Sequence, residues 1–427
     1  MLAAAIAEAS DFLEICALFG YEAEEHIVQT TDGYLLGLQR LAHRKGEEDV
    51  HVNQGPGSLS KKVVYLHHGL LMSSEVWVAL TDEQRCLPFQ LVEKGYDVWL
   101  GNNRCGDYPE HTSLSSSDPR MWSWDIRHLG TLDLAALTSR VLYETGFDKL
   151  GLVCHSQGTT ETFVALAKEH RPELGERLSV FCALAPAAYA GPLVSKFYFR
   201  FMRTLSPGTF RLFFGIHAFI PFMMNVRRLL PARVFGTFAY WMFSFLFGWS
   251  DARWERDLRH RMFQFAPVYV SAETMRWWLG SESFAKHRCI LSTTEETIRE
   301  SKSDPQRPGD IDAENDDDPQ DPCLGSQRDS TWFGPQVPPF ALWIAGSDGL
   351  VDGRRLLHRF QSGREPHINL VYSKVIEEYE HLDVLWAMDA IEQVGKEVRQ
   401  VLWNTMPEDA RRICRVPRGV HSSFFEM

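Results

Sequence analysis

The chain of 427 residues contains 44% hydrophobic and 23% charged residues. These fractions are typical of a soluble globular protein with a large apolar core, so they exclude a disordered chain, and the length excludes a peptide-sized scaffold. The formal net charge of -12 would repel a phosphate backbone, which argues against nucleic acid as a partner.

The charge is distributed unevenly along the sequence. Residues 295–329 carry twelve Asp or Glu and four Lys or Arg, whereas residues 191–249 carry seven Lys or Arg and no acidic residue. The acidic segment is rich in Pro and Asp and almost without aromatic residues, so it cannot bury enough surface to fold by itself. We therefore expect residues 291–332 to form an acidic, disordered loop.

The eight cysteines lie far apart, with no C-x-x-C pair and no Cys/His cluster at the spacing of zinc ligands. The sequence therefore predicts neither a disulfide framework nor a metal site, and no motif in it indicates a cofactor. None of the seven asparagines begins an N-x-Ser/Thr acceptor, and the N-terminal segment MLAAAIAEASDFLEI lacks the basic residues of a signal peptide. We expect an intracellular, cytosol-facing protein whose N-terminal segment is a helix of the mature protein. A membrane anchor upstream of this segment stays an open alternative.

Eight short runs rich in β-branched or alternating apolar residues have the length of β-strands. They lie at residues 26–31, 34–41, 63–68, 97–101, 150–155, 180–187, 341–346 and 369–375. Helix-like patterns lie between several of them, at residues 82–94, 130–145 and 159–170. Strands that alternate with helices predict an α/β fold with a mostly parallel central sheet that is covered on both faces.

The first two runs differ from the others because Thr31-Asp32-Gly33 between them is a hairpin-turn signal, so we expect an antiparallel pair and a mixed sheet. A long helical segment then interrupts the alternation. These features divide the chain into four parts: a first part of the core at residues 1–186, a helical, aromatic-rich cap at 187–290, the acidic loop at 291–332, and a second part of the core at 333–427.

The segment Leu150-Gly-Leu-Val-Cys-His-Ser-Gln-Gly-Thr-Thr runs from a predicted buried strand into a predicted helix and places Ser156 at the turn between them. This is the context of a nucleophile elbow, in which small residues two before and two after the serine let strand and helix approach closely. Gly158 meets the second requirement. Cys154 replaces the usual first glycine, but its side chain is small enough for a slightly wider turn.

A serine nucleophile needs a histidine base, and the base needs a carboxylate that fixes its tautomer, in the chain order Ser, Asp, His. Asp348 ends the predicted strand Ala341-Leu-Trp-Ile-Ala-Gly-Ser-Asp, with Asp352 as the local alternative for the acid. His381 follows the last predicted strand, in a loop before a helix. The sequence thus predicts a triad of Ser156, Asp348 and His381.

The oxyanion hole of this chemistry needs two backbone N–H groups. One comes from the residue after the nucleophile, which is Gln157. The other comes from the loop after the third strand, in the segment Tyr65-Leu-His-His-Gly-Leu-Leu, and we assign it to Leu70.

Five motifs in order carry a family resemblance that covers about residues 21–401: HIVQTTDGYLLGLQRL, YLHHGLLMSSEVW, GYDVWLGNNRCGDY, CHSQG and EHLDVLWAMDA. The chain resembles the acid lipase family of α/β-hydrolases, which includes lysosomal and gastric lipases, and within it the fungal steryl ester hydrolases. The resemblance implies the α/β-hydrolase fold with an inserted helical cap. For the residues named above it implies the roles of nucleophile, acid, base and oxyanion donors. Cys154, and Cys105 where the family motif has glycine, depart from its pattern.

Two further patterns have simpler explanations. His128-Leu-Gly-Thr-Leu-Asp133 matches an H-x-x-x-x-D acyltransferase pattern, but it lies in a helix-like segment near two tryptophans, so we interpret it as a packing element. His67-His68 could suggest a metal site, but adjacent residues on a strand point to opposite faces and cannot chelate one ion together.

The cap concentrates apolar surface, with 17 of the chain's 52 aromatic residues between residues 197 and 249. Residues 234–249 carry no charge, yet they are too few to span a bilayer as a helix, which takes about 20 residues. Such a segment is either buried in a tightly packed cap or dipped into lipid, and six nearby arginines favour an anionic membrane surface. As substrate-binding residues of the cap we expect Phe235, Phe238, Trp241 and Phe245.

The sequence therefore predicts a serine-dependent carboxylic ester hydrolase, a lipase that acts on steryl esters or acylglycerols at a lipid surface in lipid catabolism. Its partners would be the lipid ester and, as the resemblance implies, the surface of a lipid droplet or of the endoplasmic reticulum, on which it would be peripheral. Two alternatives stay open. One is an esterase or thioesterase that acts on a pathway metabolite, since the triad does not select the alcohol. The other is a catalytically silent, membrane-associated lipid-binding protein.

Overall fold

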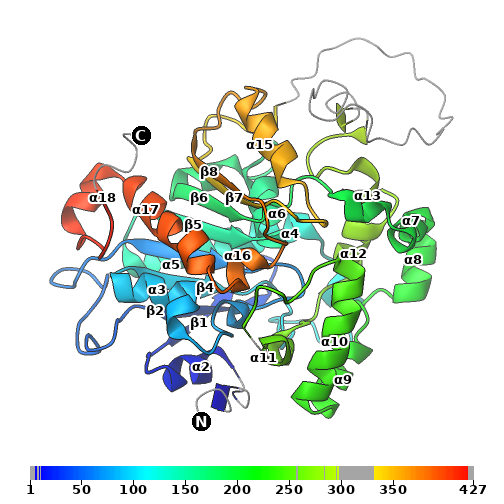
Figure 1. Ribbon diagram of the computed structural model, residues 1–427, viewed down its shortest axis with the longest axis horizontal. Coiled ribbons are helices and arrows are strands. Elements are labelled where there is room, and N and C mark those ends of the chain that lie inside the picture. The colour runs from blue at the N-terminus through cyan, green and yellow to red at the C-terminus, as the bar shows by residue number, and fades with distance from the viewer. Residues whose placement is uncertain are drawn as a thin grey trace.

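The computed structural model describes residues 5–6, 9, 11–255, 258–282, 284–294, 296–297 and 331–421. Its centre is an eight-stranded sheet with the strand order β1-β2-β4-β3-β5-β6-β7-β8 (Figure 1). The strands are β1 (Glu24–Gln29), β2 (Leu35–Leu41), β3 (Val63–His67), β4 (Asp97–Gly101), β5 (Leu150–His155), β6 (Leu178–Leu184), β7 (Phe340–Ala345) and β8 (Leu370–Ile376). β2 is antiparallel to both β1 and β4, and the other neighbours are parallel. The mixed, mostly parallel sheet expected from the sequence is confirmed.

Helices cover both faces of the sheet (Figure 1). One face carries α3 (Leu87–Lys94) and α17 (Lys396–Asn404), and the other carries α5 (Ala135–Thr145), α6 (Gln157–Leu166) and α15 (Gly353–Gln361). The central strands are accordingly apolar on both sides. In β5, Val153 belongs to the first hydrophobic core, and Leu152 and Cys154 belong to the second, because successive side chains of a strand point to opposite faces.

Two predicted helices have different ends in the structure. The segment predicted as a helix from residue 82 forms a short 3₁₀ turn at Glu83–Arg85 before α3 begins. α6 ends at Leu166, before the predicted residue 170, because Ala167 forms an isolated β-bridge with Phe333. This bridge joins the chain that follows the acidic segment to the end of the helix that follows the elbow.

The cap lies between β6 and β7, to the right of the sheet in Figure 1. Its helices are α7 (Phe197–Thr204), α8 (Pro207–Phe214), α9 (Phe222–Leu229), α10 (Ala232–Phe247), α11 (Leu258–Phe265), α12 (Ala272–Leu279) and α13 (Phe284–His287). Two hydrogen bonds that tie the cap to the core are Ser271 Oγ to Trp124 O (2.6 Å) and Trp254 Nε1 to the Asp383 carboxylate (2.9 Å). Among the described helices, none is both long enough and apolar enough to cross a membrane.

Short helices complete the core. They are α2 (Phe12–Leu18), α4 (Ile126–His128), α16 (Asp383–Trp386) and α18 (Glu408–Ile413). α4 continues into a π-helical turn at Leu129–Leu134 and then into α5. The helix predicted at residues 130–145 therefore begins as a π-helix and continues as an α-helix. α16 directly follows the loop that carries His381, and this loop lies at the carboxyl ends of the strands.

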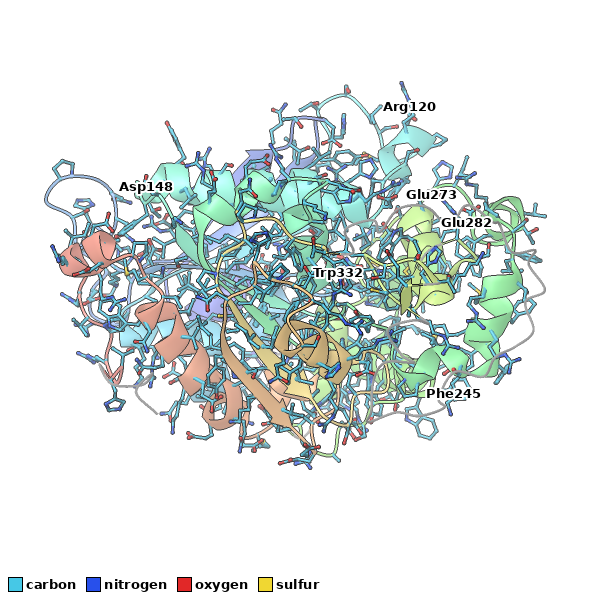
Figure 2. The ribbon with its side chains drawn as sticks, turned by 90° about the horizontal axis from the view of Figure 1, so that it is seen from above. Arg120, Asp148, Phe245, Glu273, Glu282 and Trp332 are labelled. Carbon is cyan, nitrogen blue, oxygen red and sulfur yellow. The ribbon has the colours of Figure 1, made fainter. Side chains whose placement is uncertain are left out.

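The acidic loop predicted at residues 291–332 lies mostly outside the described residues. Its last residue, Trp332, is described and is buried. The backbone N–H of Trp332 donates to the carboxylate of Glu365 (2.9 Å), which also binds Arg359 (2.6 Å). In Figure 2, Trp332 lies near the centre of the view. The second part of the core is therefore anchored at Trp332.

Gly130 lies in the π-helical turn and permits its close approach to α6. A Cβ at this position would overlap the backbone oxygen of Glu161 and lie 3.2 Å from its carbonyl carbon. We expect Gly130→Ala to lower the free energy of unfolding by about 1–3 kcal/mol, the usual cost of overpacking, as measured by urea denaturation. Gly208→Ala, in the exposed first turn of α8, is the control and should not lower the free energy of unfolding but raise it by up to about 1 kcal/mol, because alanine loses less backbone entropy on folding. Equal stability of the two variants would contradict the close approach.

Candidate active site

Ser156 stands at the turn between β5 and α6 in a backbone conformation that favours glycine. Its φ is 52° and its ψ is -119°, and its N–H donates to Leu184 O of β6 (3.1 Å). Close packing holds the turn, because a Cβ on Gly158 would lie 2.6 Å from His68 O at the end of β3. A strained serine fixed in this way presents its hydroxyl at the carboxyl edge of the sheet, as a nucleophile elbow requires.

Cys154, the departure from the first glycine of the motif, is accommodated without exposing its thiol. It is buried in β5, with Sγ 3.2 Å from Thr162 Oγ1 of α6. Burial raises the pKa of this thiol, so it stays protonated beside the serine. The elbow therefore keeps its shape with a cysteine at this position.

The structure brings together the three side chains predicted for the triad. His381 Nε2 lies 2.7 Å from Ser156 Oγ, and His381 Nδ1 lies 2.6 Å from Asp348 Oδ2. The other carboxylate oxygen of Asp348 accepts the N–H groups of Leu350 (2.8 Å) and Val351 (3.2 Å). Because the carboxylate is fixed, it favours the Nδ1–H tautomer of the imidazole, in which Nε2 can accept a proton from the serine.

Asp352, the alternative acid, has a different role. It precedes α15, and its Oδ1 accepts the N–H of Arg355 in the first turn of that helix (3.0 Å). Its own N–H donates to Tyr189 O (2.9 Å). A carboxylate that caps a helix stabilises the loop in which Asp348 lies. The geometry therefore favours Asp348 as the partner of His381.

A second histidine, His155, lies beside the first, with the two ring centroids 5.2 Å apart. Its Nε2 donates to the backbone oxygen of His381 (3.2 Å). Burial, and to a smaller extent the nearby His381, hold the pKa of His155 well below its ordinary value. The ring is therefore neutral, and it fixes the backbone of His381 without adding a charge beside it.

The two predicted oxyanion donors lie on segments that meet at Ser156. Gln157 is the first residue of α6, where backbone N–H groups have no partner inside the helix. Leu70 follows Gly69, and a Cβ on Gly69 would lie 3.1 Å from Ser156 Cβ, so this loop passes directly beside the serine. An oxyanion hole with two backbone donors requires this placement.

Two adjacent histidines fix the loop before Leu70, and here the geometry expected from the sequence is wrong. β3 ends at His67, so His68 does not follow the alternation of the strand, and the two rings stack with centroids 5.2 Å apart. His68 Nδ1 donates to Gly69 O (2.8 Å), and His68 Nε2 accepts the N–H of Asn103 (3.2 Å). Burial lowers the pKa of His68 to about 3, so the ring stays neutral and keeps both bonds.

The pattern from His128 to Asp133 forms no reacting pair. His128 Nδ1 lies 3.1 Å from Asp125 Oδ1, in the cap of α4. The Asp133 carboxylate binds the buried guanidinium of Arg104 (2.6 Å), which also binds Asp32 of the first hairpin (2.7 Å). These contacts support the interpretation of the segment as structural.

Sequence reasoning missed a buried carboxylate behind the elbow. Glu161 of α6 accepts hydrogen bonds from Gln157 Nε2 (2.9 Å), Asn103 Nδ2 (2.8 Å) and His67 Nε2 (2.8 Å). Gln157 Oε1 in turn accepts the indole N–H of Trp278, in α12 of the cap (2.8 Å). The available signal was a single charged residue in an otherwise uncharged helix, four positions after Gln157 and therefore on the same helical face.

The four cap residues predicted to bind substrate do not share one face of α10. Phe235 is 3% exposed, whereas Phe238, Trp241 and Phe245 are 68%, 71% and 67% exposed. Figure 2 places Phe245 at the outer edge of the molecule. The helix is thus apolar on two faces, one buried and one turned to solvent, and substrate binding by these four residues stays a prediction.

The cap is less basic in the structure than in the sequence, because several of its arginines are paired. Arg211 binds Glu273 of α12 (2.6 Å), and Arg227 binds Asp107. Arg228 donates to the backbone oxygen of Asp107 (3.2 Å). Two of the six arginines are thus in ion pairs, which weakens the charge argument for an anionic membrane, and the exposed aromatic residues are the stronger observation.

Comparisons with known proteins show the family of the chain. A family model described as a partial α/β-hydrolase lipase region matches residues 12–81, and a model of the α/β hydrolase fold matches residues 62–204. Sterol esterase 2 of Saccharomyces cerevisiae is 35% identical over 389 residues, which are 88% of this chain and 69% of that protein. The chain belongs to the acid lipase family of α/β-hydrolases.

Other proteins similar to this acid lipase family member match over comparable lengths. Gastric triacylglycerol lipase of Bos taurus is 29% identical over 90% of this chain and 89% of its own length. Lysosomal acid lipase/cholesteryl ester hydrolase of Homo sapiens is 27% identical over 88% of this chain and 86% of its own. Among solved structures, a thermophilic esterase from Thermogutta terrifontis is similar over 90% of this chain and 100% of its own, at 15% identity and a TM-score of 0.48. The family expected from the motifs is confirmed.

In this acid lipase, Asp383 joins the loop of His381 to the cap. Its carboxylate accepts the indole N–H of Trp254 (2.9 Å) and the backbone N–H of Glu380 (2.8 Å). Burial raises the pKa of Asp383 to about 6, although both donors oppose the shift. The folded protein therefore holds this proton more tightly than the unfolded chain does.

Because the pKa of Asp383 is higher in the folded state, its contribution to stability is present below about pH 4 and is lost as the pH rises to about 6. We expect the free energy of unfolding of the wild type, relative to that of Asp383→Asn, to fall by up to about 2 kcal/mol between pH 4 and pH 7. Urea denaturation of both proteins at several pH values measures this difference. Parallel pH profiles would show that the carboxyl group titrates as it does in the unfolded chain.

Proposed function

We propose that this protein is a serine-dependent lipase that hydrolyses steryl esters or acylglycerols at a lipid surface. The observation that carries the proposal is the uninterrupted chain of contacts from Ser156 Oγ through His381 to Asp348. This arrangement activates a weak nucleophile for attack on an ester. Family membership supports the class of reaction, since the relatives include proteins named as a sterol esterase, a triacylglycerol lipase and a cholesteryl ester hydrolase.

In the proposed mechanism, His381 takes the proton of Ser156 as the hydroxyl oxygen attacks the ester carbonyl, and Asp348 stabilises the imidazolium that forms. The backbone N–H groups of Leu70 and Gln157 bind the oxyanion. The histidine then gives its proton to the leaving alcohol. A water molecule that the same histidine activates releases the fatty acid from the acyl-enzyme, so the steps require no metal and no cofactor.

The cap supports a large apolar substrate. Ser156 is only 8% exposed, and we propose that segments of the cap move to let a steryl ester reach the hydroxyl. The inner face of α10 is aromatic, with the ring of Phe243 stacked on that of Phe263 in α11 (centroids 5.6 Å apart). A small polar ester would need neither a movable cover nor an apolar one.

The outer face of the cap supports the lipid-surface part of the proposal. The exposed aromatic band on α7 and α10 consists of Phe197, Phe201, Phe238, Trp241 and Phe245. Tyr198 connects the two helices, because its ring lies 5.7 Å from that of Phe245 and its hydroxyl donates to Leu246 O (2.8 Å). Large exposed apolar patches on a protein mark sites of interaction. We infer a peripheral, cytosol-facing enzyme on a lipid droplet or on the endoplasmic reticulum.

Fatty-acid release from emulsified steryl oleate, emulsified trioleoylglycerol and a soluble short-chain ester tests the reaction. We expect the wild type to release fatty acid from the emulsions and Ser156→Ala to be slower by at least about 10³-fold, because the triad acts as a unit. Release from the soluble ester alone would support an esterase for a small metabolite. Absence of release, together with no labelling of Ser156 by a fluorophosphonate, would support a silent lipid-binding protein.

Replacement of Phe238, Trp241 and Phe245 together by serine tests the lipid surface. Burial of one such side chain contributes about 2 kcal/mol, so we expect hydrolysis of emulsified steryl oleate to fall by at least about tenfold, and that of the soluble ester to change less than about twofold. The control is Ile413→Ser with Val416→Ser, which removes exposed apolar side chains at and after α18, across the molecule from the cap in Figure 1. If hydrolysis of the soluble ester fell equally, the substitutions would act on the active site and not on binding to lipid.

A further inference from the structure

We propose that Glu161 is a positioning residue that holds the two oxyanion-donor segments in register, and that Trp278 extends this control to the cap. The proposal rests on the ester hydrolase function proposed above and concerns the same site. Glu161 is fully buried in α6, five residues after Ser156. Its carboxylate does not contact the reacting atoms, so any effect on catalysis passes through the groups that it binds.

The carboxylate of Glu161 joins three segments that surround the serine. Oε1 accepts hydrogen bonds from Gln157 Nε2 (2.9 Å) and Asn103 Nδ2 (2.8 Å), and Oε2 accepts one from His67 Nε2 (2.8 Å). Gln157 begins α6, Asn103 follows β4, and His67 ends β3. A buried carboxylate is strongly destabilising without such donors, so all three side chains are kept directed at it.

The chemistry of the two partners permits one orientation of the Gln157 side chain. A carboxylate only accepts, so the NH₂ group faces Glu161, and an indole N–H only donates, so the amide oxygen faces Trp278 at 2.8 Å. The side chain is thereby held at one end by the core and at the other by the cap. The backbone N–H of the same residue is the proposed oxyanion donor, so both contacts restrict its direction.

The segment of the second donor is held by the same carboxylate. His67, three residues before Leu70, donates to Glu161 and also lies 3.0 Å from Asn103 Oδ1. The backbone N–H of Asn103 donates to His68 Nε2 (3.2 Å), whose ring is bound to the loop of Leu70. A change at Glu161 would therefore displace both amides together. Oxyanion stabilisation requires donors fixed to within about 0.5 Å.

Trp278 connects this network to a cap helix that is seated on the core. Both Ser271 Oγ (2.6 Å) and Thr274 Oγ1 (3.3 Å), at the start of α12, donate to Trp124 O. Trp278 lies further along the same helix, and its indole N–H donates to the side chain of Gln157. The position of α12 is thus transmitted by one hydrogen bond to the residue that follows the nucleophile.

Kinetics on the soluble ester test the role of Glu161, because this substrate does not depend on a lipid surface. Glu161→Gln keeps the volume but directs an amide NH₂ at groups that are donors themselves. We expect kcat to fall by about 30-fold and KM to change by less than about twofold, because the loss concerns the oxyanion and not the bound ester. An unchanged kcat would overturn the proposal for Glu161.

Conservative substitutions test the connection to the cap. Trp278→Phe keeps an aromatic ring and removes the N–H, so we expect kcat to fall by about fivefold, the effect of one neutral hydrogen bond. Trp249→Phe is the matched control, since it removes a buried cap indole N–H that has no hydrogen-bond partner in the structure, and it should keep the wild-type kcat. Equal rates for the two variants would overturn the role of Trp278.

A double-mutant cycle shows whether Trp278 acts through Gln157. Gln157→Met removes the side-chain amide and keeps the backbone N–H. If the bond carries the effect, Trp278→Phe should cost less than about 1.5-fold in the Gln157→Met background. Losses that multiply would show that the indole acts through other contacts, and would overturn this part of the proposal. If Glu161→Gln does not fold, Gln157→Met tests the role of Glu161, because it removes the contact between Gln157 and that carboxylate, and an unchanged kcat would overturn the proposal.

A trifluoromethyl ketone separates positioning from general stability, because Ser156 adds to its carbonyl and the adduct places an oxyanion in the hole. Its affinity should fall in proportion to kcat across the variants, while their thermal midpoints stay within about 2 °C of the wild type. Affinity that does not follow kcat would overturn the proposal. A wild type without serine-dependent release would instead overturn the proposed function, so the two failures are distinguishable.

Discussion

The strained backbone of Ser156 is the constraint on which the rest of the site depends. A φ of 52° for a serine costs on the order of 1–3 kcal/mol, and it persists only where the surrounding packing fixes it. Here that packing is the approach of α6 to the end of β3, which the missing side chain of Gly158 permits. The same approach brings the loop of Leu70 beside the serine and sets Glu161 behind both segments. The nucleophile and its oxyanion donors are thus products of one contact between a helix and a strand.

Burial also decides which histidine near the serine can act as a base. His68 and His155 are buried with their rings in hydrogen bonds to backbone groups, and burial lowers the pKa of each. Neither places a positive charge beside the imidazolium that the proposed mechanism forms on His381. Both rings are neutral and stabilise a loop: His68 binds the loop of Leu70, and His155 binds the loop of His381. A cluster of histidines thereby performs one acid–base role and two structural roles.

The eight strands could be predicted, and so could the contacts of His381 with Ser156 and Asp348, because their signals are local: short apolar runs, turn residues, and polar groups at strand ends. The hydrogen bonds of Glu161 could not, because its partners come from three segments distant in sequence and one cap helix. The error at His67 and His68 arose because the third strand was predicted to end at residue 68, whereas β3 ends at His67. The ring of His68 was therefore expected on the opposite face from that of His67, but the two rings stack. The exposed side of α10 could not be predicted either, for another reason. A helix that is apolar all round contains no pattern that tells its buried face from its exposed one.

The exposed aromatic band has a consequence for the protein away from lipid. An apolar surface of this kind is hidden from water when it packs against lipid, and equally when it packs against a second copy of the chain. A second copy and a lipid surface would then compete for the same residues. Any association of two caps would therefore weaken when a lipid surface is supplied. The same exposed band would then affect both the solubility of the protein and its access to substrate.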